Sequence, residues 1–256
     1  MPLNAASVAV SIGFDGTTMR DAVLGSNTQR NRVLNAMSNA DLALLQPHLE
    51  RVTFKFGQSL QSSNRAITNL YFFESGIASV AAAANGGGRR AGIAVVGHEG
   101  MTGLPALHGT DRSQFDIFIQ IKGDGHRIAA QKLREALDQS ITLLRCLLLY
   151  AHAFGIQVNY TALANARGYI VERLARWLLM VHDRLDTDEM TLTHEFLALM
   201  LGVRRSRVSI ALEVLESRGL VETARARVIV KDRVGLEGYS NGLYGTPEAE
   251  YERLFD

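Results

Sequence analysis

Two short amphipathic segments joined by one glycine constrain the fold of this chain most strongly. Thr193 is a predicted N-cap of a first helix, and Gly202 permits a tight turn into a second helix that begins near Arg204. Gly219 ends the second helix, and the apolar runs over 220–230 predict a small β-wing. This order of elements predicts a winged helix-turn-helix.

The second helix of this pair has an inner and an outer face. The inner face consists of Val203, Val208, Leu212 and Leu215. Arg205, Ser206 and Ser209 fall on the outer face, where arginine can bind guanine and serine can bind a base or a phosphate. Cations at a helix start oppose the helix dipole, and DNA phosphates would compensate this. Residues 190–233 contain eight Arg or Lys against five Asp or Glu, whereas the whole chain has a net charge of +1. A local DNA-binding surface is therefore expected.

Residues 51–128 have the short apolar runs of a β-domain. Such runs occur over 52–56, 70–73, 77–80, 93–96 and 115–121. Turn sequences separate them at Gly57, Ser75–Gly76, Asn85–Gly88 and Gly123–Gly125. We interpret Asn85–Gly88 as a hairpin turn and not as a phosphate-binding loop, because no helix follows it. The spacing predicts a β-sandwich or barrel.

From Gln131 the apolar spacing becomes helical. The repeated positions are Leu133, Leu137, Ser140, Leu144, Leu147, Ala151, Phe154 and Val158. They form a heptad pattern of about seven turns, which one small domain cannot bury. The expected partner is the same helix of a second subunit, with an internal core helix as the alternative. Residues 155–165, which include Gly155 and Asn159, are a candidate hinge.

Composition narrows the remaining classes of protein. Cys146 is the only cysteine in 256 residues, so a disulfide framework, a cysteine-ligated zinc site and a four-cysteine iron–sulfur cluster within one chain are excluded. The most apolar run, 143–154, contains Arg145 and His152 and predicts no membrane span. The first 29 residues lack periodicity and a secretory signal, which predicts a poorly ordered leader. A cytoplasmic location is expected.

Two segments resemble the Crp/Fnr family of transcription regulators. They are 192–209, with the sequence LTHEFLALMLGVRRSRVS, and 215–221, with the sequence LESRGLV. The resemblance covers about residues 34–232 and is stronger in the DNA-binding part than in the β-domain. It implies an α+β protein with an N-terminal double-stranded β-roll (a jelly roll of the cyclic-nucleotide-binding type), a long dimerisation helix and a C-terminal winged helix-turn-helix.

The resemblance also implies the positions of the DNA contacts. The family's first base-reading arginine falls on Arg205, its second reader, usually glutamate, on Ser206, and its third, often arginine, on Ile210. Its phosphate-contacting positions fall on His194, Arg204 and Arg207. Thr193, Ser209, Arg225 and Arg227 complete the expected DNA-binding set. Because Ser206 and Ile210 depart from the family pattern, the operator sequence of better-known relatives does not transfer.

Half of a cyclic-nucleotide site resembles the family pattern. In cAMP-binding members a Gly-Glu-Leu motif contacts the ribose, and a later Arg-Ser pair takes the cyclic phosphate. Arg112 and Ser113 fall at the phosphate position, whereas the ribose-binding glutamate falls on Thr102 and Glu99 is three residues out of register. The expected effector residues are therefore Glu99, Thr102, Arg112 and Ser113. We expect a small effector other than cAMP, or no effector, and an anion remains compatible with the arginine.

Other sensing mechanisms of the family are not expected. The oxygen-sensing branch uses clustered N-terminal cysteines, which this chain lacks, so no iron–sulfur cluster is predicted. Haem-sensing members use an axial histidine or an N-terminal proline. His98, His108, His126 and His152 are interpreted as ordinary hydrogen-bonding residues. Cys146 is interpreted as a packed side chain, with an intersubunit redox thiol as the alternative.

The expected organisation has five parts. They are a leader over 1–29, the β-roll sensor over 30–130, the dimerisation helix over 131–164, the winged helix-turn-helix over 165–235 and a tail over 236–256. The expected partners are double-stranded DNA, a second copy of the chain and RNA polymerase, and not a membrane. A homodimer would place two recognition helices about 34 Å apart on a pseudo-palindromic operator.

Two other functions are considered. A ligand-sensing β-roll could regulate a partner protein without binding DNA, although the basic start of the second helix argues against this. An enzyme is not expected. His194 and Glu195 begin like a zinc-protease motif, but position 198 is Ala where the second histidine would stand.

Overall fold

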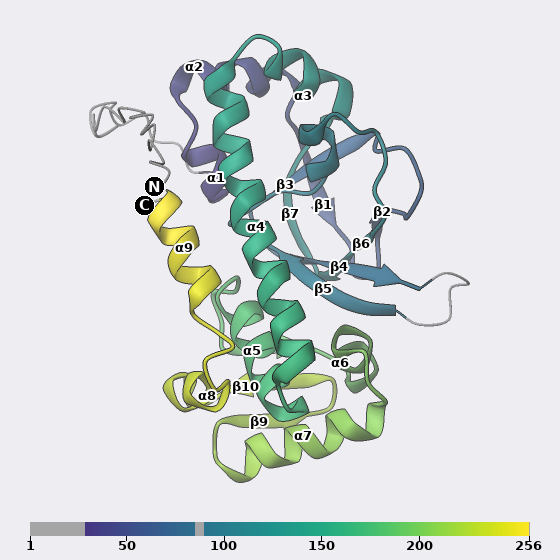
Figure 1. Ribbon diagram of the computed structural model, residues 1–256, viewed down its shortest axis with the longest axis vertical. Helices are drawn as coiled ribbons and strands as arrows, with labels where there is room; N and C mark the ends of the chain where they lie inside the picture. Colours follow the sequence, from purple (N-terminus) through teal and green to yellow (C-terminus); the bar gives the residue numbers. More distant parts are fainter. Residues whose placement is uncertain (1–28, 85–89, 256) are drawn as a thin grey trace, which may run out of the picture.

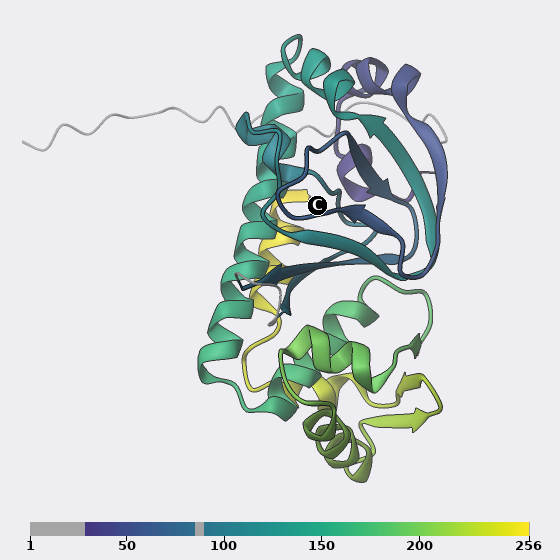
Figure 2. The same cartoon turned by 90° about the vertical axis from the view of Figure 1, so that its right-hand side faces the viewer.

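The computed structural model describes residues 29–84 and 90–255, so all but the last residue of the predicted leader over 1–29, and the Asn85–Gly88 turn, lie outside the described residues. A β-structured part and a helical part both lie against one long helix, α4 (Ile141–Arg167) (Figure 1). Figure 2 shows both parts on the same side of α4. The predicted α+β architecture is confirmed.

The β-roll consists of two antiparallel sheets, with strand orders β1-β7-β3 and β2-β6-β4-β5. Its strands are β1 (Glu50–Phe54), β2 (Ser59–Gln61), β3 (Asn69–Phe73), β4 (Ile77–Ala83), β5 (Arg90–Val96), β6 (Asp116–Ile121) and β7 (Gly123–Ala129). Short helical segments accompany them: α1 (Arg32–Asn35), α2 (Asn39–Leu45), η1 (Gln46–His48) and η2 (Leu104–His108). Phe54 and Phe73 are buried in one cluster with Val80 and Ile119 of the other sheet, whereas Phe72, next to Phe73 in β3, belongs to the cluster on the opposite face.

Strand β7 lies where the sequence predicted a turn at Gly123–Gly125, and that prediction is wrong. This strand is the centre of its sheet and pairs with both β1 and β3. A Cβ atom on Gly125 would lie 2.1 Å from the carbonyl oxygen of Phe72, and one on Gly123 would lie 2.3 Å from that of Ser75. The glycines therefore permit a close backbone approach within a strand. The short strand β2 was also not predicted.

The continuous helix predicted over 131–164 is two helices. The first, α3 (Ala130–Leu137), ends before Ser140, whose hydroxyl caps α4 by accepting the N–H of Leu143. The Ser140 hydroxyl also donates to the buried carboxylate of Asp41. Burial alone would raise the pKa of Asp41, but hydrogen bonds from Ser140 and neighbouring hydroxyls hold it below the usual value. Ser140 is therefore a cap and not part of a dimer seam.

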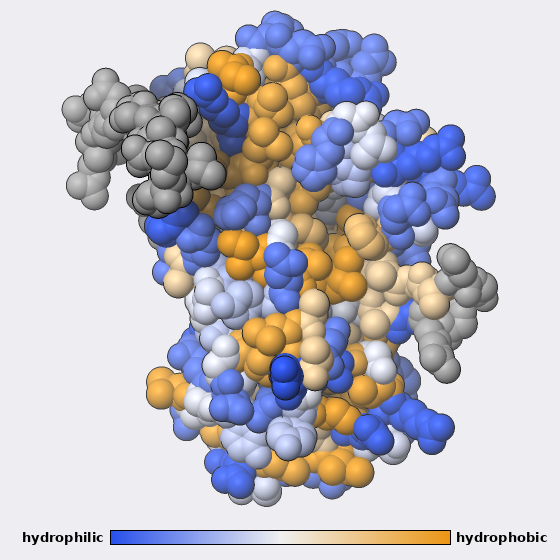
Figure 3. All heavy atoms as spheres, in the orientation of Figure 1, coloured by the Kyte–Doolittle hydropathy of each residue, from blue (hydrophilic) through white to orange (hydrophobic). Residues whose placement is uncertain are grey.

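The helix α4 carries apolar residues on two faces. Its inner face is buried and consists of Leu143, Leu147, Tyr150, Ala153, Gln157 and Ala164. Its outer stripe is exposed or half-buried and consists of Ile141, Leu144, Leu148, Ala151, Gly155, Val158 and Ala162. The predicted seam was therefore partly wrong, because Leu147 faces the core and Phe154 packs against it. Orange residues gather along this helix in Figure 3.

The helix α4 is continuous and largely apolar. The helix continues through the predicted hinge at 155–165 and ends only at Arg167. By length and composition alone it could cross a membrane, which is weak evidence for a span. The heptad spacing of the outer stripe offers another explanation for its exposed apolar residues, namely pairing with a second helix.

The helical part begins after α4 and forms a winged helix-turn-helix. Its elements are α5 (Ile170–His182), β8 (Glu189–Thr191), α6 (His194–Leu201), α7 (Arg205–Ser217), β9 (Val221–Ala224) and β10 (Arg227–Val230). The three strands form an antiparallel sheet in the order β8-β10-β9. Trp177 and Leu178 of α5 belong to the same buried cluster as Leu212 and Leu215 of α7, so the helix-turn-helix has a core of its own.

The segment predicted as a tail over 236–256 contains two helices, α8 (Arg233–Tyr239) and α9 (Thr246–Phe255). In Figures 1 and 2, α9 runs back along α4 toward the β-roll. Tyr251 is buried in the β-roll core, and its hydroxyl donates to the carbonyl oxygen of Glu99 at 2.5 Å. The guanidinium of Arg32 lies 4.7 Å from the Tyr251 ring centre. The segment that follows the wing therefore joins the two parts of the molecule.

The helix-turn-helix is docked on the β-roll. Ile77 and Val95 of the β-roll belong to the same buried cluster as the α5 core residues. The first helix of the motif, α6, packs on β5, where a Cβ on Gly92 would lie 2.1 Å from the Cε atom of Met200. Because these contacts bury apolar surface, the two parts meet through a packed interface and not only through the connecting helix.

Candidate DNA-binding surface and effector cavity

The helix pair α6–α7 has the local geometry that the sequence predicted. The hydroxyl of Thr193 accepts the N–H of Phe196 and caps α6. Gly202 follows α6 with φ +63°, a left-handed conformation that glycine adopts without a steric penalty. Val208 and Leu212 are at most 2% exposed, so the back of α7 is fixed to the domain core.

The first turn of α7 faces solvent. Arg204, Arg205, Ser206 and Arg207 are all exposed. The Nε atom of Arg205 lies 2.6 Å from a carboxylate oxygen of Glu195, which is also exposed. An ion pair this open to water contributes little to stability, so it leaves Arg205 available to exchange its partner for a base or a phosphate.

A hydrogen bond links the two helices behind this turn. The Nδ1 atom of His194 lies 2.9 Å from the hydroxyl oxygen of Ser209. Both side chains are half-buried, and Ser209 also lies 3.5 Å from the carbonyl oxygen of Arg205. The predicted contacts at His194 and Ser209 are therefore brought together at one edge of the motif.

The wing presents two further arginines. Strands β9 and β10 pair in register from Val221–Val230 to Ala224–Arg227, and Ala226 in the connecting turn has φ +56°. Arg225 and Arg227 are exposed, and Arg227 forms an ion pair with Glu189 at 3.2 Å. The wing thus adds positive charge at solvent-exposed positions of the same domain as α7.

The β-roll contains a cavity of about 320 Å³ beside α4. Its wall is largely apolar and includes Val80, Met101, Leu104, Pro105, Ile117, Phe154 and Val158. Polar groups enter it from Gln61, Thr102, His108, Ser113 and Asn159. No carboxylate or guanidinium of the described residues lines this cavity. Its chemistry suits an uncharged ligand better than a phosphate.

Two of the four predicted effector residues line this cavity and two do not. Thr102 and Ser113 are buried in its wall. The side chain of Arg112 is 62% exposed and lies 3.8 Å from Asp111. Glu99 is buried at the junction between the β-roll and the helix-turn-helix. The four residues predicted to bind an effector therefore do not line one cavity, because the chain turns Arg112 outward and Glu99 toward α5.

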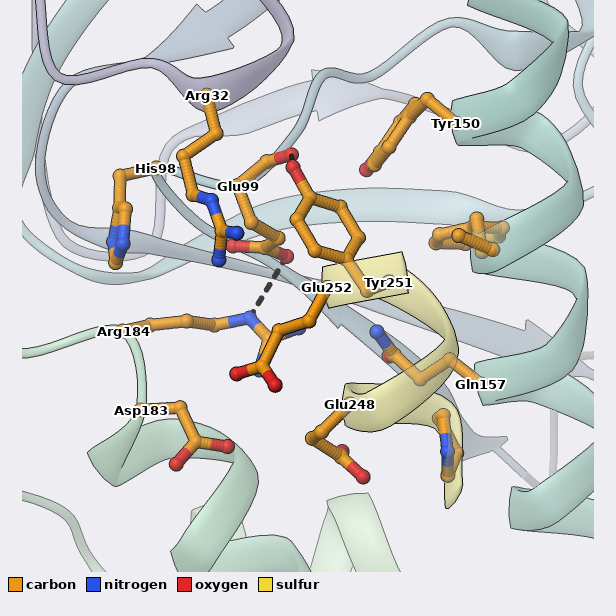
Figure 4. A pocket seen from close by; sticks show the side chains of 13 residues that line it. Arg32, His98, Glu99, Tyr150, Gln157, Asp183, Arg184, Glu248, Tyr251 and Glu252 are labelled. Atoms are coloured by element: carbon orange, nitrogen blue, oxygen red, sulfur yellow. Dashed lines mark hydrogen bonds and ion pairs between the residues drawn. The ribbon is translucent and has the colours of Figure 1, made fainter. Parts of the chain in front are cut away.

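Glu99 forms a buried ion pair across the domain junction (Figure 4). The Nε atom of Arg184 donates to its carboxylate at 2.8 Å, and the two side chains are 8% and 11% exposed. Arg184 also donates to the carbonyl oxygen of Met180, while the Glu99 carboxylate accepts the N–H of Gly97 at 3.0 Å. Burial is the largest single influence and lowers the pKa of the Arg184 guanidinium, but the charges of Glu99, Asp183 and Glu248, with the hydrogen bond to Glu99, together raise it.

This junction has a second, small cavity, which is lined by charged groups. They are Arg32, Glu99, Asp183, Arg184, Glu248 and Glu252, with His98 beside them (Figure 4). Sequence reasoning missed Arg184 and Glu248 as interface residues. The signal was faint, since a lone arginine after a helix and an acidic residue in a tail are ordinary surface features.

The candidate cofactor ligands are scattered. Within 29–84 and 90–255, no three His, Cys, Asp or Glu residues are placed to hold a metal ion. His108 lines the β-roll cavity, His126 lies 3.4 Å from Glu74, and His152 lies 3.5 Å from Glu250. Burial, with the nearby charge of Asp41, raises the pKa of Cys146 to about 11. This thiol is therefore protonated at neutral pH and a weak nucleophile.

Comparisons with known proteins agree with this geometry. Residues 172–239 match the model of the Crp-like helix-turn-helix domain. A putative transcriptional regulator of the Crp/Fnr family from Eubacterium rectale superposes with a TM-score of 0.65 at 20% identity, over 82% of this chain and 98% of that one. FixK2 from Bradyrhizobium japonicum gives 0.65 at 17% identity, over 75% and 96% of the two chains.

A third structure shares the same fold. The c-di-GMP-responsive global regulator CLP from Xanthomonas campestris superposes with a TM-score of 0.60 at 15% identity, over 75% of this chain and 99% of that one. No curated protein matches the sequence. The domain match identifies the DNA-binding part, and the solved structures supply the fold around it. Residues 172–239 are therefore a Crp-like helix-turn-helix domain, in a chain that has the fold of these solved regulators.

Proposed function

We propose that this chain acts as a cytoplasmic homodimer that reads a pseudo-palindromic operator and responds to a small effector. The observation that carries the proposal is α7, whose first turn is exposed and cationic while its back is fixed in a core. This is the arrangement that a recognition helix needs to enter a major groove. In this proposal the chain acts through DNA, and through RNA polymerase at the promoter, and not as an enzyme.

The exposed residues divide into base-contacting and phosphate-contacting groups. We assign base contacts to Arg205, Ser206 and Ser209. We assign phosphate contacts to Thr193, His194, Arg204, Arg207, Arg225 and Arg227. The first group lies on the outer side of α7 or at its edge, and the second lies at the first turn of α7, at the start of α6 and in the wing, as expected if phosphates position the helix and bases select the sequence.

The outer stripe of α4 supports the dimer. Ile141 and Leu148 are 58% and 40% exposed, and they stand at successive equivalent heptad positions with Gly155 and Ala162. A Cβ on Gly155 would meet no atom within 4 Å, so the outer side of α4 has room for the close approach of a second helix. Pairing of α4 with its copy would remove this apolar surface from water.

The effector belongs in the β-roll cavity under this proposal. Ala151, Gly155 and Val158 border the cavity and also belong to the outer stripe of α4. A ligand there would contact the residues that meet the second subunit, which gives it a route to the dimer geometry. The cavity chemistry favours a small, largely apolar ligand with a few hydrogen-bonding groups.

Binding of genomic DNA fragments to the purified protein tests the DNA-reading part. Affinity for a selected operator should fall steeply with salt, because phosphate contacts release counterions. Arg205→Ala should weaken operator binding by about 1–3 kcal/mol and relax selectivity at one base position. Arg253→Ala removes an exposed arginine from α9 and serves as the matched control. Equal binding by the Arg205→Ala variant and the parent would contradict the assignment, and no salt-sensitive binding of any fragment would favour regulation through a protein partner.

Sedimentation of a seam variant tests the dimer. Leu148→Arg places a charge in the outer stripe, so the protein should sediment as a monomer and lose most of its operator affinity. Arg145→Ala, an exposed change on the same helix, should leave the dimer intact. A Leu148→Arg protein that remains a dimer would show that the subunits meet elsewhere.

A further inference from the structure

Ile210 is a large apolar side chain on the outer surface of α7. It is 60% exposed, whereas Val208, Leu212 and Leu215 on the same helix are at most 2% exposed. At 3.6 residues per turn, Ile210 points about 150° away from the centre of the buried face. Ile210 therefore lies outside the core of its own domain, and packing in that core does not explain an apolar residue at this position.

Its neighbours on the outer face are polar. Ser206 lies one turn earlier on the same side of the helix, and Glu213 follows about one turn later. Glu216 is already hydrogen-bonded to Thr223, and DNA phosphates would repel the Glu213 carboxylate, so we expect the base contacts of α7 to end at Ile210. Ile210 is thus the last side chain along α7 that is placed to reach a base edge.

The chemistry of the major groove leaves one good partner for such a side chain. Isoleucine has no hydrogen-bonding group, and covering the polar edge of guanine, adenine or cytosine would strip water from that edge without replacing its hydrogen bonds. The C5 methyl group of thymine is the apolar feature that the groove presents. A β-branched side chain also has one dominant rotamer in a helix, so Ile210 is held in place before DNA arrives.

We propose that Ile210 is a specificity-determining residue that selects thymine in each half-site by packing against its methyl group. The inference rests on the proposed operator binding and adds to it the chemical group that α7 recognises through Ile210. It assigns apolar recognition to one point in an otherwise hydrogen-bonded interface.

Deoxyuridine substitution measures this contact directly, because uracil differs from thymine only by the absent methyl group. An operator is first selected with the parent protein from random duplexes. Each thymine of one half-site is then replaced in turn by deoxyuridine. We expect one position at which the parent loses about fourfold in affinity, the effect of burying one methyl group. The Ile210→Ala variant should bind the thymine and uracil duplexes equally, and should no longer select thymine there.

Two matched variants exclude general damage. Ile210→Val keeps a β-branched apolar side chain and should retain part of the methyl effect. Val234→Ala truncates a 79% exposed valine in α8 and should leave the operator, the affinity and the methyl effect unchanged. If the parent selects an operator but shows no methyl effect that Ile210→Ala removes, this inference is overturned while the proposed function stands. If the parent selects no sequence, the proposed function itself fails.

Discussion

The two cavities of this molecule differ in chemistry and in location. The wall of the β-roll cavity is largely apolar, and its polar groups are hydroxyls, amides and the imidazole of His108. The junction cavity is lined by Arg32, Glu99, Asp183, Arg184 and Glu248 (Figure 4). Glu99 and Arg112 are the charged residues that the sequence suggested for ligand binding, and neither lines the β-roll cavity. Glu99 lies in the junction, and Arg112 faces solvent.

This difference bears on how the helix-turn-helix is held on the β-roll. A buried ion pair adds little net stability. An arrangement that separates the two partners is strongly destabilised, because either charge alone is costly to bury. We infer that the Glu99–Arg184 pair helps to fix how the helix-turn-helix sits on the β-roll.

Removal of Arg184 should have the largest effect on this comparison. Arg184→Ala leaves the Glu99 carboxylate buried without its guanidinium partner, and we expect a loss of about 3–5 kcal/mol in unfolding free energy. Denaturant titration measures this loss. Arg253→Ala, which breaks an exposed pair with Glu250, should leave the unfolding midpoint unchanged.

The paired substitution shows whether the effect comes from the isolated charge. Glu99→Gln combined with Arg184→Met removes both charges, keeps an acceptor for the Gly97 N–H, and should recover most of the lost stability. If the double variant is as unstable as Arg184→Ala alone, then lost packing, and not an unpaired carboxylate, explains the loss.

A nucleotide titration should give the intermediate effect or none. A ligand at one hundred times its Kd stabilises a protein by about 2.7 kcal/mol, which would raise Tm by several degrees in a chain of this size. We expect no rise with cAMP or c-di-GMP at about 1 mM, because Arg112 faces solvent and the cavity wall lacks a guanidinium among the described residues. A rise in Tm that Arg112→Ala abolishes would restore the predicted phosphate site and break the contrast between the two cavities.

The pH dependence of Glu248 should give the smallest effect. Burial raises the pKa of this carboxyl group, although the N–H of Gly245 and the charge of Arg184 oppose the rise. A raised pKa means that the folded protein holds the proton more tightly than the unfolded chain, so the contribution to stability is present at low pH and lost as pH rises through the folded pKa. Glu248→Gln cannot ionise, and it should melt higher than the parent at about pH 8.

The same measurement at about pH 4 provides the check, because the difference in Tm should disappear once Glu248 is protonated in both states. Glu252→Gln changes an exposed residue of the same helix and should shift Tm equally little at both pH values. A constant stabilisation by Glu248→Gln at every pH would show that the amide acts through better packing or hydrogen bonding.

Local patterns predicted the DNA-binding end well and the junction poorly. Thr193, Gly202 and Val208 each follow from rules that act within a few residues, namely capping, left-handed conformation and helical periodicity. Glu99 and Arg184 are 85 positions apart in the chain, and the sequence around each residue gives no indication that they pair. Tertiary packing decides such contacts, and short-range pattern does not encode it.

The β-roll and α4 show intermediate success for the same reason. Alternation located most strands, but Gly125 suggested a turn, because sequence does not show that the Phe72 backbone lies against it. The heptad seam was found with the wrong members, since Leu147 and Leu148 are both apolar and only the fold decides which one faces the core. Ser140 was assigned to the seam because the sequence does not show that its hydroxyl bonds to Asp41.

The position of α9 has a consequence for how the protein is made. Tyr251 completes the hydrophobic core of the β-roll, yet it is translated after the whole helix-turn-helix. Domains usually fold in the order in which they leave the ribosome. Here the first domain to emerge reaches its final packing only after the second has been synthesised, so nascent chains pass through a stage in which the helix-turn-helix exists beside an incompletely packed β-roll.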